Sequence, residues 1–259
     1  MELPIYQIDA FTDQLFTGNP AAVVVLTEWL APDVMLAIAQ ENNLAETAFV
    51  LPRGPEFHIR WFTPEVEVDL CGHATLASAH VLFSEKRTSN AHIIFRYKGG
   101  TIVVQQAGDQ LAMEFPSRPA EPIRREPALV AALGTAPLEV YRARDLMAVL
   151  SSEAEVRALR PDIAGLARLD AFGFIVTAPG DECDFVSRFF APRAGIPEDP
   201  VTGSAHCTLV PYWSERLGKT ELHARQVSQR GGELFCEDLG DRIKLAGRCV
   251  EYLRGVIRV

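Results

Sequence analysis

The sequence lacks the features by which several classes of protein are recognised. No stretch approaches the roughly 18 uninterrupted apolar residues of a membrane-spanning helix, and the first residues show no basic segment followed by an apolar one, as a secretory signal would. The five cysteines are odd in number and form no CxxC pair, which argues for reduced thiols rather than a disulfide framework. We therefore expect a cytoplasmic protein that has no contact with a membrane.

An excess of basic residues is missing as well. The chain of 259 residues carries a formal net charge of −9, so it offers no basic face to hold a phosphate backbone. Nucleic acid is thereby excluded as the expected partner. The hydrophobic share of 48% is enough for a substantial core. These properties predict a globular protein whose partner is a small molecule.

Strand and helix patterns are interleaved along the chain. A helix is expected from Pro32 to about Gln40, and another opens at Ser152 with a capping-box pattern after a strand at Met147–Leu150. Further strands are expected at residues 5–11, 22–26, 48–51, 58–62, 91–97, 101–105 and 111–115. Three prolines within residues 116–122 mark a boundary near the middle of the chain. We expect one domain at residues 1–118 and a second at 119–259, with a final strand that can return to the first.

The second half of the sequence repeats the first. Arg60-Trp61-Phe62-Thr63-Pro64 recurs as Arg188-Phe189-Phe190-Ala191-Pro192, and Gly72-His73-Ala74 corresponds to Gly203-Ser204-Ala205. In each half a strand, a proline-containing loop, a glycine turn and an apolar helix follow one another. A repeat of about half the chain is too long for a solenoid. It predicts a duplicated domain arranged about a pseudo-two-fold axis.

The segment after each glycine turn predicts where a ligand would bind. Residues 74–83 are apolar almost all round, which is typical of a helix buried on most faces. The free N–H groups and the dipole at a helix start favour an anion, and glycine lets a ligand approach the backbone closely. We expect the two helix starts to hold one carboxylated substrate in a cleft between the halves. The predicted substrate-binding residues are Gly72, Ala74, Gly203 and Ser204.

The polar residues near these turns allow other interpretations. Cys71 and His73 could begin a zinc site, but no further ligands follow at a zinc-binding spacing, so no metal is expected. Ser204, His73 and Asp199 are the residue types of a hydrolase triad, but the serine lacks the G-x-S-x-G context. Both interpretations are disfavoured.

Cys71 and Glu46 each have an ordinary structural interpretation. Cys71 could act as a thiol base or nucleophile, yet its counterpart in the second half is Thr202, and a buried cysteine is most often a small core residue. A structural role is therefore favoured for Cys71. Glu46 stands at the entry to an apolar strand with no cation close in sequence, and by composition alone it would be a solvated acid at a strand end.

Six sequence blocks, taken together, resemble a known family. They are DAFT at residues 9–12, GNPAAV at 18–23, NLAETAF at 43–49, RWFTP at 60–64, EVDLCGHAT at 67–75 and EDPVTGSA at 198–205. In this order they are similar to the signature blocks of the PhzF-like isomerase family of phenazine biosynthesis. The resemblance implies the diaminopimelate-epimerase-like fold. In that fold two similar α/β domains each wrap a mostly antiparallel, barrel-like sheet around a central helix.

The resemblance also implies roles for particular residues. The family's general acid/base carboxylate falls on Glu46, with His73 and Asp199 as its polar companions and Ser204 beside the second helix start. The implied reaction is an isomerisation of a substrate like trans-2,3-dihydro-3-hydroxyanthranilate, in which a proton leaves one carbon and returns at another. It needs neither cofactor nor metal, and the family analogy implies a homodimer.

Two other functions fit the same fold. A cofactor-independent epimerase or racemase of an amino or hydroxy acid would need a thiol from each half, but the halves offer Cys71 and Thr202, which disfavours it. A non-catalytic family member that binds metabolites would be expected to have lost some of Glu46, His73, Asp199 and Ser204. All four are present.

Overall fold

The computed structural model describes all 259 residues as two compact units, which we describe one at a time. The first unit comprises Met1–Glu114 and Ala246–Val259, and the second comprises Phe115–Leu245. The sequence placed the boundary after residue 118. In the structure the first unit ends at Glu114, four residues earlier. The boundary lies within strand β8 (Gln110–Pro116), which ends at the first of the three prolines. The last strand, β18 (Cys249–Arg258), belongs to the first unit.

One continuous set of paired strands forms the first unit. In order of pairing these are β18, β1, β2, β3, β4, β6, β7 and β8, with the short β5 also pairing with β4. The pairs β2–β3 and β4–β6 are parallel and the others are antiparallel. The remaining bounds are β1 Glu2–Ala10, β2 Asn19–Val25, β3 Glu46–Arg53, β4 Glu56–Phe62, β5 Glu67–Val68, β6 His92–Tyr97 and β7 Gly100–Ala107.

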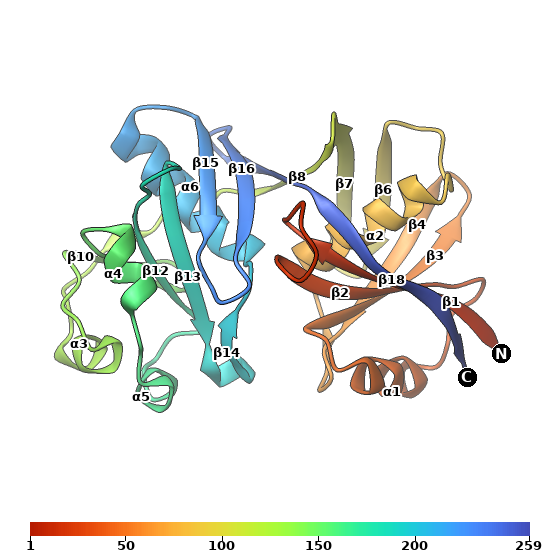
Figure 1. Ribbon diagram of the computed structural model, residues 1–259, viewed down its shortest axis with the longest axis horizontal. Coiled ribbons are helices and arrows are strands. Elements are labelled where there is room, and N and C mark those ends of the chain that lie inside the picture. The colour runs from red at the N-terminus through yellow and green to blue at the C-terminus, as the bar shows by residue number, and fades with distance from the viewer. The chain divides into compact units, whose positions relative to one another are not determined.

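Helix α2 (Gly72–Ser84) lies inside this sheet and forms the centre of the unit. It packs against β1, β2, β3 and β18, which lie around it in Figure 1. Leu76 and Leu82 are fully buried, as are the alanines that let the strands approach the helix closely. The prediction of a helix buried on most faces over residues 74–83 is confirmed.

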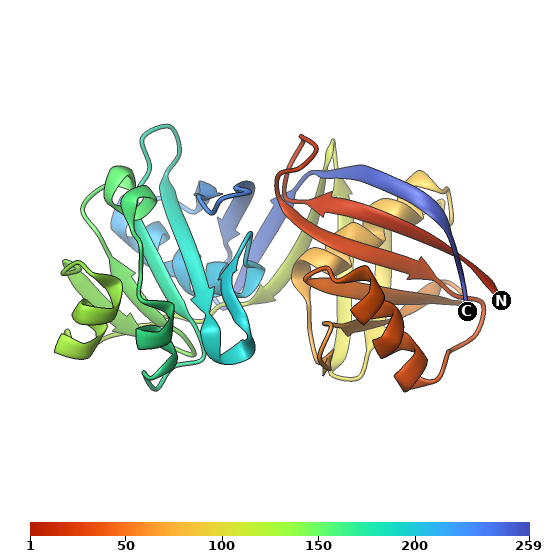
Figure 2. The same ribbon diagram turned by 60° about the horizontal axis from the view of Figure 1, so that its bottom comes forward.

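Helix α1 (Pro32–Asn42) covers the outer face of the same sheet (Figure 2). Its Met35 and Ile38 pack in a cluster with Phe49 and Phe62, whose rings meet edge to face at 5.5 Å. The sheet is therefore apolar on both faces, which explains the unbroken valine run of β2.

The second unit repeats this arrangement. Its strands pair in the order β9, β10, β11, β12, β13, β15 and β16, with the short β14 also on β13, and again two pairs, β11–β12 and β13–β15, are parallel. Helix α6 (Gly203–Leu217) takes the place of α2. The strand bounds are β9 Glu121–Pro122, β10 Glu139–Arg142, β11 Leu146–Val149, β12 Phe174–Pro179, β13 Phe185–Ala191, β14 Ile196–Asp199, β15 Glu221–Gln226, β16 Gly232–Asp238 and β17 Arg242–Gly247. The duplication expected from the sequence is present in the order and direction of the strands.

Three short helices, α3 (Pro127–Leu133), α4 (Glu153–Ala158) and α5 (Ile163–Ala167), pack on the outside of the second unit. Half of the capping box predicted at Ser152 is present: its hydroxyl accepts from the backbone N–H of Glu155, but the Glu155 carboxylate accepts from the N–H of Ser151 rather than Ser152. A single turn, η1, spans Pro192–Ala194. No helix of either unit is both long and apolar enough to cross a membrane.

The proline-rich segment after β8 supplies a hydrogen bond to the second central helix. Pro211 lies inside α6 and has no N–H to give to the carbonyl of Cys207, four residues earlier. The backbone N–H of Arg118 donates to that carbonyl instead, at 2.9 Å. The helix therefore tolerates an internal proline because the segment that leads into the second unit satisfies the freed acceptor.

Truncation of Leu82 should test whether α2 is the core of the first unit. Leu82 is fully buried near the end of the helix, away from its first turn, so Leu82→Ala is expected to cost about 2–5 kcal/mol of unfolding free energy. Leu253→Ala makes the same change at a side chain that is 43% exposed and should cost less than about 0.5 kcal/mol. Urea titrations followed by tryptophan fluorescence measure both. Equal midpoints for the two variants would contradict this account of the core.

Candidate active site

The first turn of α2 carries the predicted residues of the first unit. Cys71 is the N-cap in an extended conformation, and Gly72, His73 and Ala74 form the turn itself. The hydroxyl of Thr75 donates to the carbonyl of Cys71 at 2.6 Å. This bond stabilises the start of the helix. As in any helix, the first backbone N–H groups have no partner within the helix and are available to a ligand.

Glu46 and His73 meet at this turn. Glu46 is the first residue of β3, where it stands opposite Ala21 of β2, and its Oε2 lies 3.0 Å from Nε2 of His73. The side chains are only 13% and 7% exposed. Neither of the two atoms makes an aligned hydrogen bond with any protein group. A buried acid and a buried imidazole thus face each other with bonding capacity left over, which is unusual outside functional sites.

Cys71 approaches the other nitrogen of the same ring. Its Sγ lies 3.5 Å from Nδ1 of His73. Ligand atoms of Glu46, Cys71 and His73 lie within 4.8 Å of one another, a spacing at which such residues can hold a metal ion. However, the thiol and the carboxylate face different nitrogens of the imidazole, so one nitrogen does not face both. The geometry suits proton exchange through the ring better than coordination of one ion.

Burial and charge shift the pKa values of this cluster in definite directions. Burial raises the pKa of the Cys71 thiol above its ordinary 9.0, and the charge of Glu46 adds to the rise. Burial alone would lower the pKa of His73, but its acidic neighbours outweigh burial and raise that pKa above 6.5. Because burial raises the pKa of Cys71 and so disfavours its thiolate, we attribute the rise at neutral pH to Glu46. Glu46 therefore favours the protonated form of His73.

The predicted residues of the second unit belong to a different network. Asp199 accepts a hydrogen bond from the hydroxyl of Thr202 at 2.5 Å, and Thr202 is the N-cap of α6. The fully buried Gln226 joins both: its Oε1 accepts from the N–H of Thr202 at 2.8 Å, and its Nε2 donates to the carbonyl of Asp199 at 2.8 Å. The second unit therefore has one carboxyl group held by a threonine and a glutamine where the first unit has a cluster of acid, imidazole and thiol.

Ser204 lies in the first turn of α6 and contacts an arginine. Nη2 of Arg144 donates to its hydroxyl at 3.0 Å and also to the buried carboxylate of Asp145 at 2.9 Å. Phe172 packs against the guanidinium, 4.6 Å from its ring centroid. Gly203 precedes Ser204, and a Cβ at that glycine would meet only Leu245, at 3.7 Å. The start of α6 thus has room for close approach and a cation nearby.

No pattern in the sequence indicates Arg144 or Gln226 as a site residue. Neither lies in one of the six blocks, and Gln226 follows Thr202 by 24 residues. Gln226 reaches the N-cap because β15, which it ends, pairs in parallel with β13, where Gln226 stands opposite Ser187. The contact of Gln226 with Thr202 could be predicted only from the register of the β13–β15 pairing.

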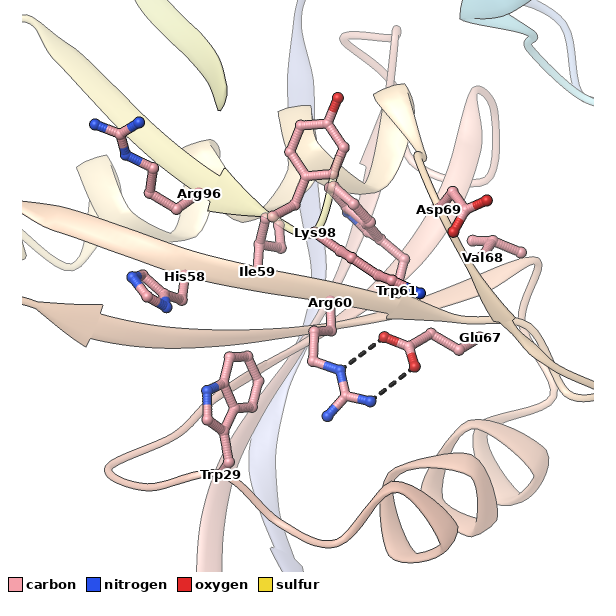
Figure 3. Close-up of a pocket in the computed structure, with 11 residues that line it drawn as sticks. Trp29, His58, Ile59, Arg60, Trp61, Glu67, Val68, Asp69, Arg96 and Lys98 are labelled. Atoms are coloured by element: carbon pink, nitrogen blue, oxygen red, sulfur yellow. Dashed lines mark hydrogen bonds and ion pairs between the residues drawn. The ribbon is translucent and has the colours of Figure 1, made fainter. Parts of the chain in front are cut away.

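A pocket of about 620 Å³ opens along β4 and β6 of the first unit (Figure 3). Arg60 and Glu67 line it and form a two-pronged ion pair, with both nitrogen–oxygen distances 2.7 Å. This pair ties β5 to β4, and Arg188 and Glu198 repeat it between β13 and β14. Glu46 and His73 do not line this pocket. The charges of Arg60 and Glu67 therefore have a structural role that both units share.

The pKa values of the two buried histidines should be shifted in opposite directions from the ordinary value of 6.5. The ring of His206, in α6, packs against Phe185 and has one hydrogen-bonding partner, the carbonyl of Thr202. Burial lowers its pKa to about 4, whereas the pKa of His73 is raised well above 6.5. A histidine NMR titration measures both. Glu46→Gln should lower the pKa of His73, because burial then acts without the carboxylate, while Glu28→Gln, at an exposed loop residue, should change neither.

The same shift has a consequence for stability. A pKa raised on folding stabilises the folded protein fully below the unfolded value near 6.5, and this contribution is lost as the pH rises through the folded pKa. The stability difference between wild type and Glu46→Gln should therefore shrink as the pH rises above 6.5. A titration of His73 below 6.5 in the wild type would contradict the assignment of the ion pair.

Loss of Gln226 should weaken the second unit. Gln226→Ala leaves the buried N–H of Thr202 without its acceptor, which should cost about 1–3 kcal/mol of unfolding free energy. Gln229→Ala, at an exposed glutamine of the same unit, should have almost no effect. Urea unfolding measures both. An undiminished stability of Gln226→Ala would show that another group takes over the N–H.

Comparison with known proteins identifies the family. The profile of the phenazine biosynthesis-like proteins (PhzC-PhzF) matches residues 8–255. A protein of Pseudomonas aeruginosa named "Uncharacterized isomerase" is 50% identical over an alignment of 260 positions that covers 100% of each chain. The crystal structure of a PhzF-family protein from Enterococcus faecalis superposes with a TM-score of 0.99 at 46% identity, covering 100% of each chain.

A more distant structure shares the fold alone. It is a hydroxyproline epimerase from Agrobacterium vitis, with a TM-score of 0.62 and 10% identity, covering 99% of this chain and 92% of the other. The expected fold class, a mostly antiparallel sheet around a central helix in each of two halves, is confirmed. The chain belongs to the PhzF-like family of isomerases and has the diaminopimelate-epimerase-like fold.

Proposed function

We propose that the protein is a cofactor-independent isomerase in which Glu46 moves a proton between two carbons of a small, carboxylated, unsaturated substrate. One observation carries the proposal: the buried contact of Glu46 with His73, in which Oε2 and Nε2 are 3.0 Å apart and neither has an aligned hydrogen bond. A carboxylate so placed can take a proton from carbon and return it. The adjacent imidazole, whose pKa is raised, can hold and supply a proton at Nε2.

The helix starts would hold the substrate's carboxylate. In α2 and α6 the first turns present backbone N–H groups, at Gly72 and Ala74 in the first unit and at Gly203 and Ser204 in the second. Arg144 adds a positive charge beside Ser204. Asp199 would act as a polar companion that Thr202 and Gln226 keep in place. That both sets serve one substrate molecule stays a prediction.

A two-thiol epimerase or racemase is less compatible with these residues. Such an enzyme needs an acid and a base, and the second unit offers Thr202 where the first has Cys71. The hydroxyl of Thr202 donates to Asp199 at 2.5 Å, and an alcohol is a far weaker acid than a thiol. A purely metabolite-binding protein would not need Glu46 and His73 as a buried ion pair. Both alternatives predict no isomerisation that depends on Glu46.

Conversion of trans-2,3-dihydro-3-hydroxyanthranilate in deuterated water tests the proposal. Wild type should give the isomer with deuterium at the newly protonated carbon, observed by NMR. Glu46→Gln should slow this reaction about 10²–10⁴-fold, because the amide can neither take nor return a proton. Glu28→Gln, an exposed carboxylate without a role, should turn over like the wild type.

The outcomes separate three cases. Equal rates for wild type and a folded Glu46→Gln would exclude Glu46 as the acid/base group. Exchange of deuterium into the α-carbon of an amino or hydroxy acid, with inversion, would instead favour the epimerase. If wild type converts nothing, the same exchange assay on a panel of unsaturated carboxylic acids searches for the substrate. A sizing column tests the homodimer that the family resemblance implies.

A further inference from the structure

The imidazole of His73 bridges a thiol and a carboxylate through its two nitrogens. Sγ of Cys71 lies 3.5 Å from Nδ1, and Oε2 of Glu46 lies 3.0 Å from Nε2. We propose that Cys71 is a positioning residue whose sulfur accepts the Nδ1 proton of His73, so that the Nε2 proton is the one exchanged with Glu46. This inference rests on the proposed function of Glu46 as the acid/base group.

The position of Cys71 is better explained by this role than by helix capping. N-cap residues are usually Ser, Thr, Asp or Asn, whose oxygens accept a backbone N–H of the first turn. The sulfur of Cys71 faces the backbone N–H of Ala74 but makes no capping hydrogen bond of ordinary geometry. Its counterpart Thr202 is also an N-cap without a capping bond, but it is tied to Asp199 and Gln226. Each N-cap side chain therefore engages the polar group of its own unit, and in the first unit that group is His73.

The proton transfer itself creates no buried charge. The Nε2–H bond of the imidazolium breaks as an O–H bond forms on Oε2, and the proton is the only atom that moves. Imidazolium and carboxylate become imidazole and carboxylic acid, so the pair has zero net charge before and after. This balance matters because an isolated charge is costly at a site with 13% or less exposure. Glu46 can then deliver this proton to one carbon of the substrate and take a proton from the other carbon, and passing that proton back to Nε2 restores the starting pair.

The sulfur decides which neutral form of the ring remains. After the transfer, His73 has one proton, which must stay on Nδ1 if Nε2 is to take the next one from Glu46. Burial keeps Cys71 as a thiol, and a thiol sulfur is a weak acceptor directed at Nδ1. The orienting partner of an acid/base histidine commonly sets its tautomer in this way.

The tautomer of His73 can be measured without any substrate. In ¹⁵N NMR above the pKa of His73, wild type should show the Nδ1–H form, and Cys71→Ala and Cys71→Val, which lack the acceptor, should shift to the Nε2–H form. Cys71→Ser keeps an acceptor and should retain Nδ1–H. Cys183→Ser is the matched control, since that half-buried thiol contacts the carbonyl of Phe185 in the second unit.

Turnover gives the second readout. Cys71→Ala should lower kcat about 10-fold with KM unchanged, since the sulfur acts through His73 and does not touch the substrate. Cys71→Ser should recover most of the loss, and Cys183→Ser should match the wild type. Thermal unfolding shows which variants are folded. The test needs only one of Cys71→Ala and Cys71→Val to fold.

The results distinguish this proposal from the proposed function. An Nε2–H tautomer in the wild type, an unchanged tautomer in Cys71→Ala or Cys71→Val, or a tautomer shift without loss of kcat each overturns the role of Cys71. Dependence of turnover on Glu46 would still stand in those cases. If Glu46→Gln is fully active, the proposed function fails, and the tautomer data still decide whether Cys71 holds the Nδ1 proton.

Discussion

The contact between Glu46 and His73 is the constraint on which the first unit depends. A buried carboxylate and a buried imidazole are tolerated only because each compensates the charge of the other, so β3 and α2 must bring them together to within hydrogen-bonding distance. The strands around α2 enforce this. Parallel pairing sets Glu46 opposite Ala21, and the apolar body of α2, packed on four strands, fixes where its first turn lies. The packing of α2 against these strands therefore keeps His73 next to Glu46.

The two units share structural side-chain interactions but differ in the polar residues at the start of the central helix. Both units retain the two-pronged arginine–glutamate pair, Arg60 with Glu67 and Arg188 with Glu198. Both also return a side chain to the N-cap carbonyl of the central helix, from Thr75 in one and from His206 in the other. These shared bonds are structural. The polar residues at the helix starts differ, in contrast: an acid, an imidazole and a thiol meet in the first unit, whereas Asp199 is held by Thr202 and Gln226 in the second.

Much of this could be predicted because it depends on local sequence. The repeat, the buried central helix and the proximity of Glu46 and His73 follow from blocks that lie at the starts of elements, where the family resemblance names each residue. Gln226, Arg144 and the bond from Arg118 to Cys207 could not be predicted in this way. The register of a parallel strand pair, the position of the β10–β11 turn and the path of a proline-rich segment determine them, and none of these leaves a local pattern. The boundary after residue 118 was placed at the prolines, although β8 carries the chain into the second unit before them.

The uneven distribution of ionisable groups also limits the chemistry that the fold can perform. A reaction with separate acid and base needs two groups that change protonation near neutral pH, whereas Thr202 has an alcohol at the position where Cys71 has a thiol. Gln226 and Asp199 further engage that alcohol: its proton goes to Asp199, and its oxygen accepts from Gln226. In the first unit, by comparison, two titratable side chains, Cys71 and Glu46, contact the imidazole ring of a third, His73. Proton removal and return by a single carboxylate requires no more than this cluster.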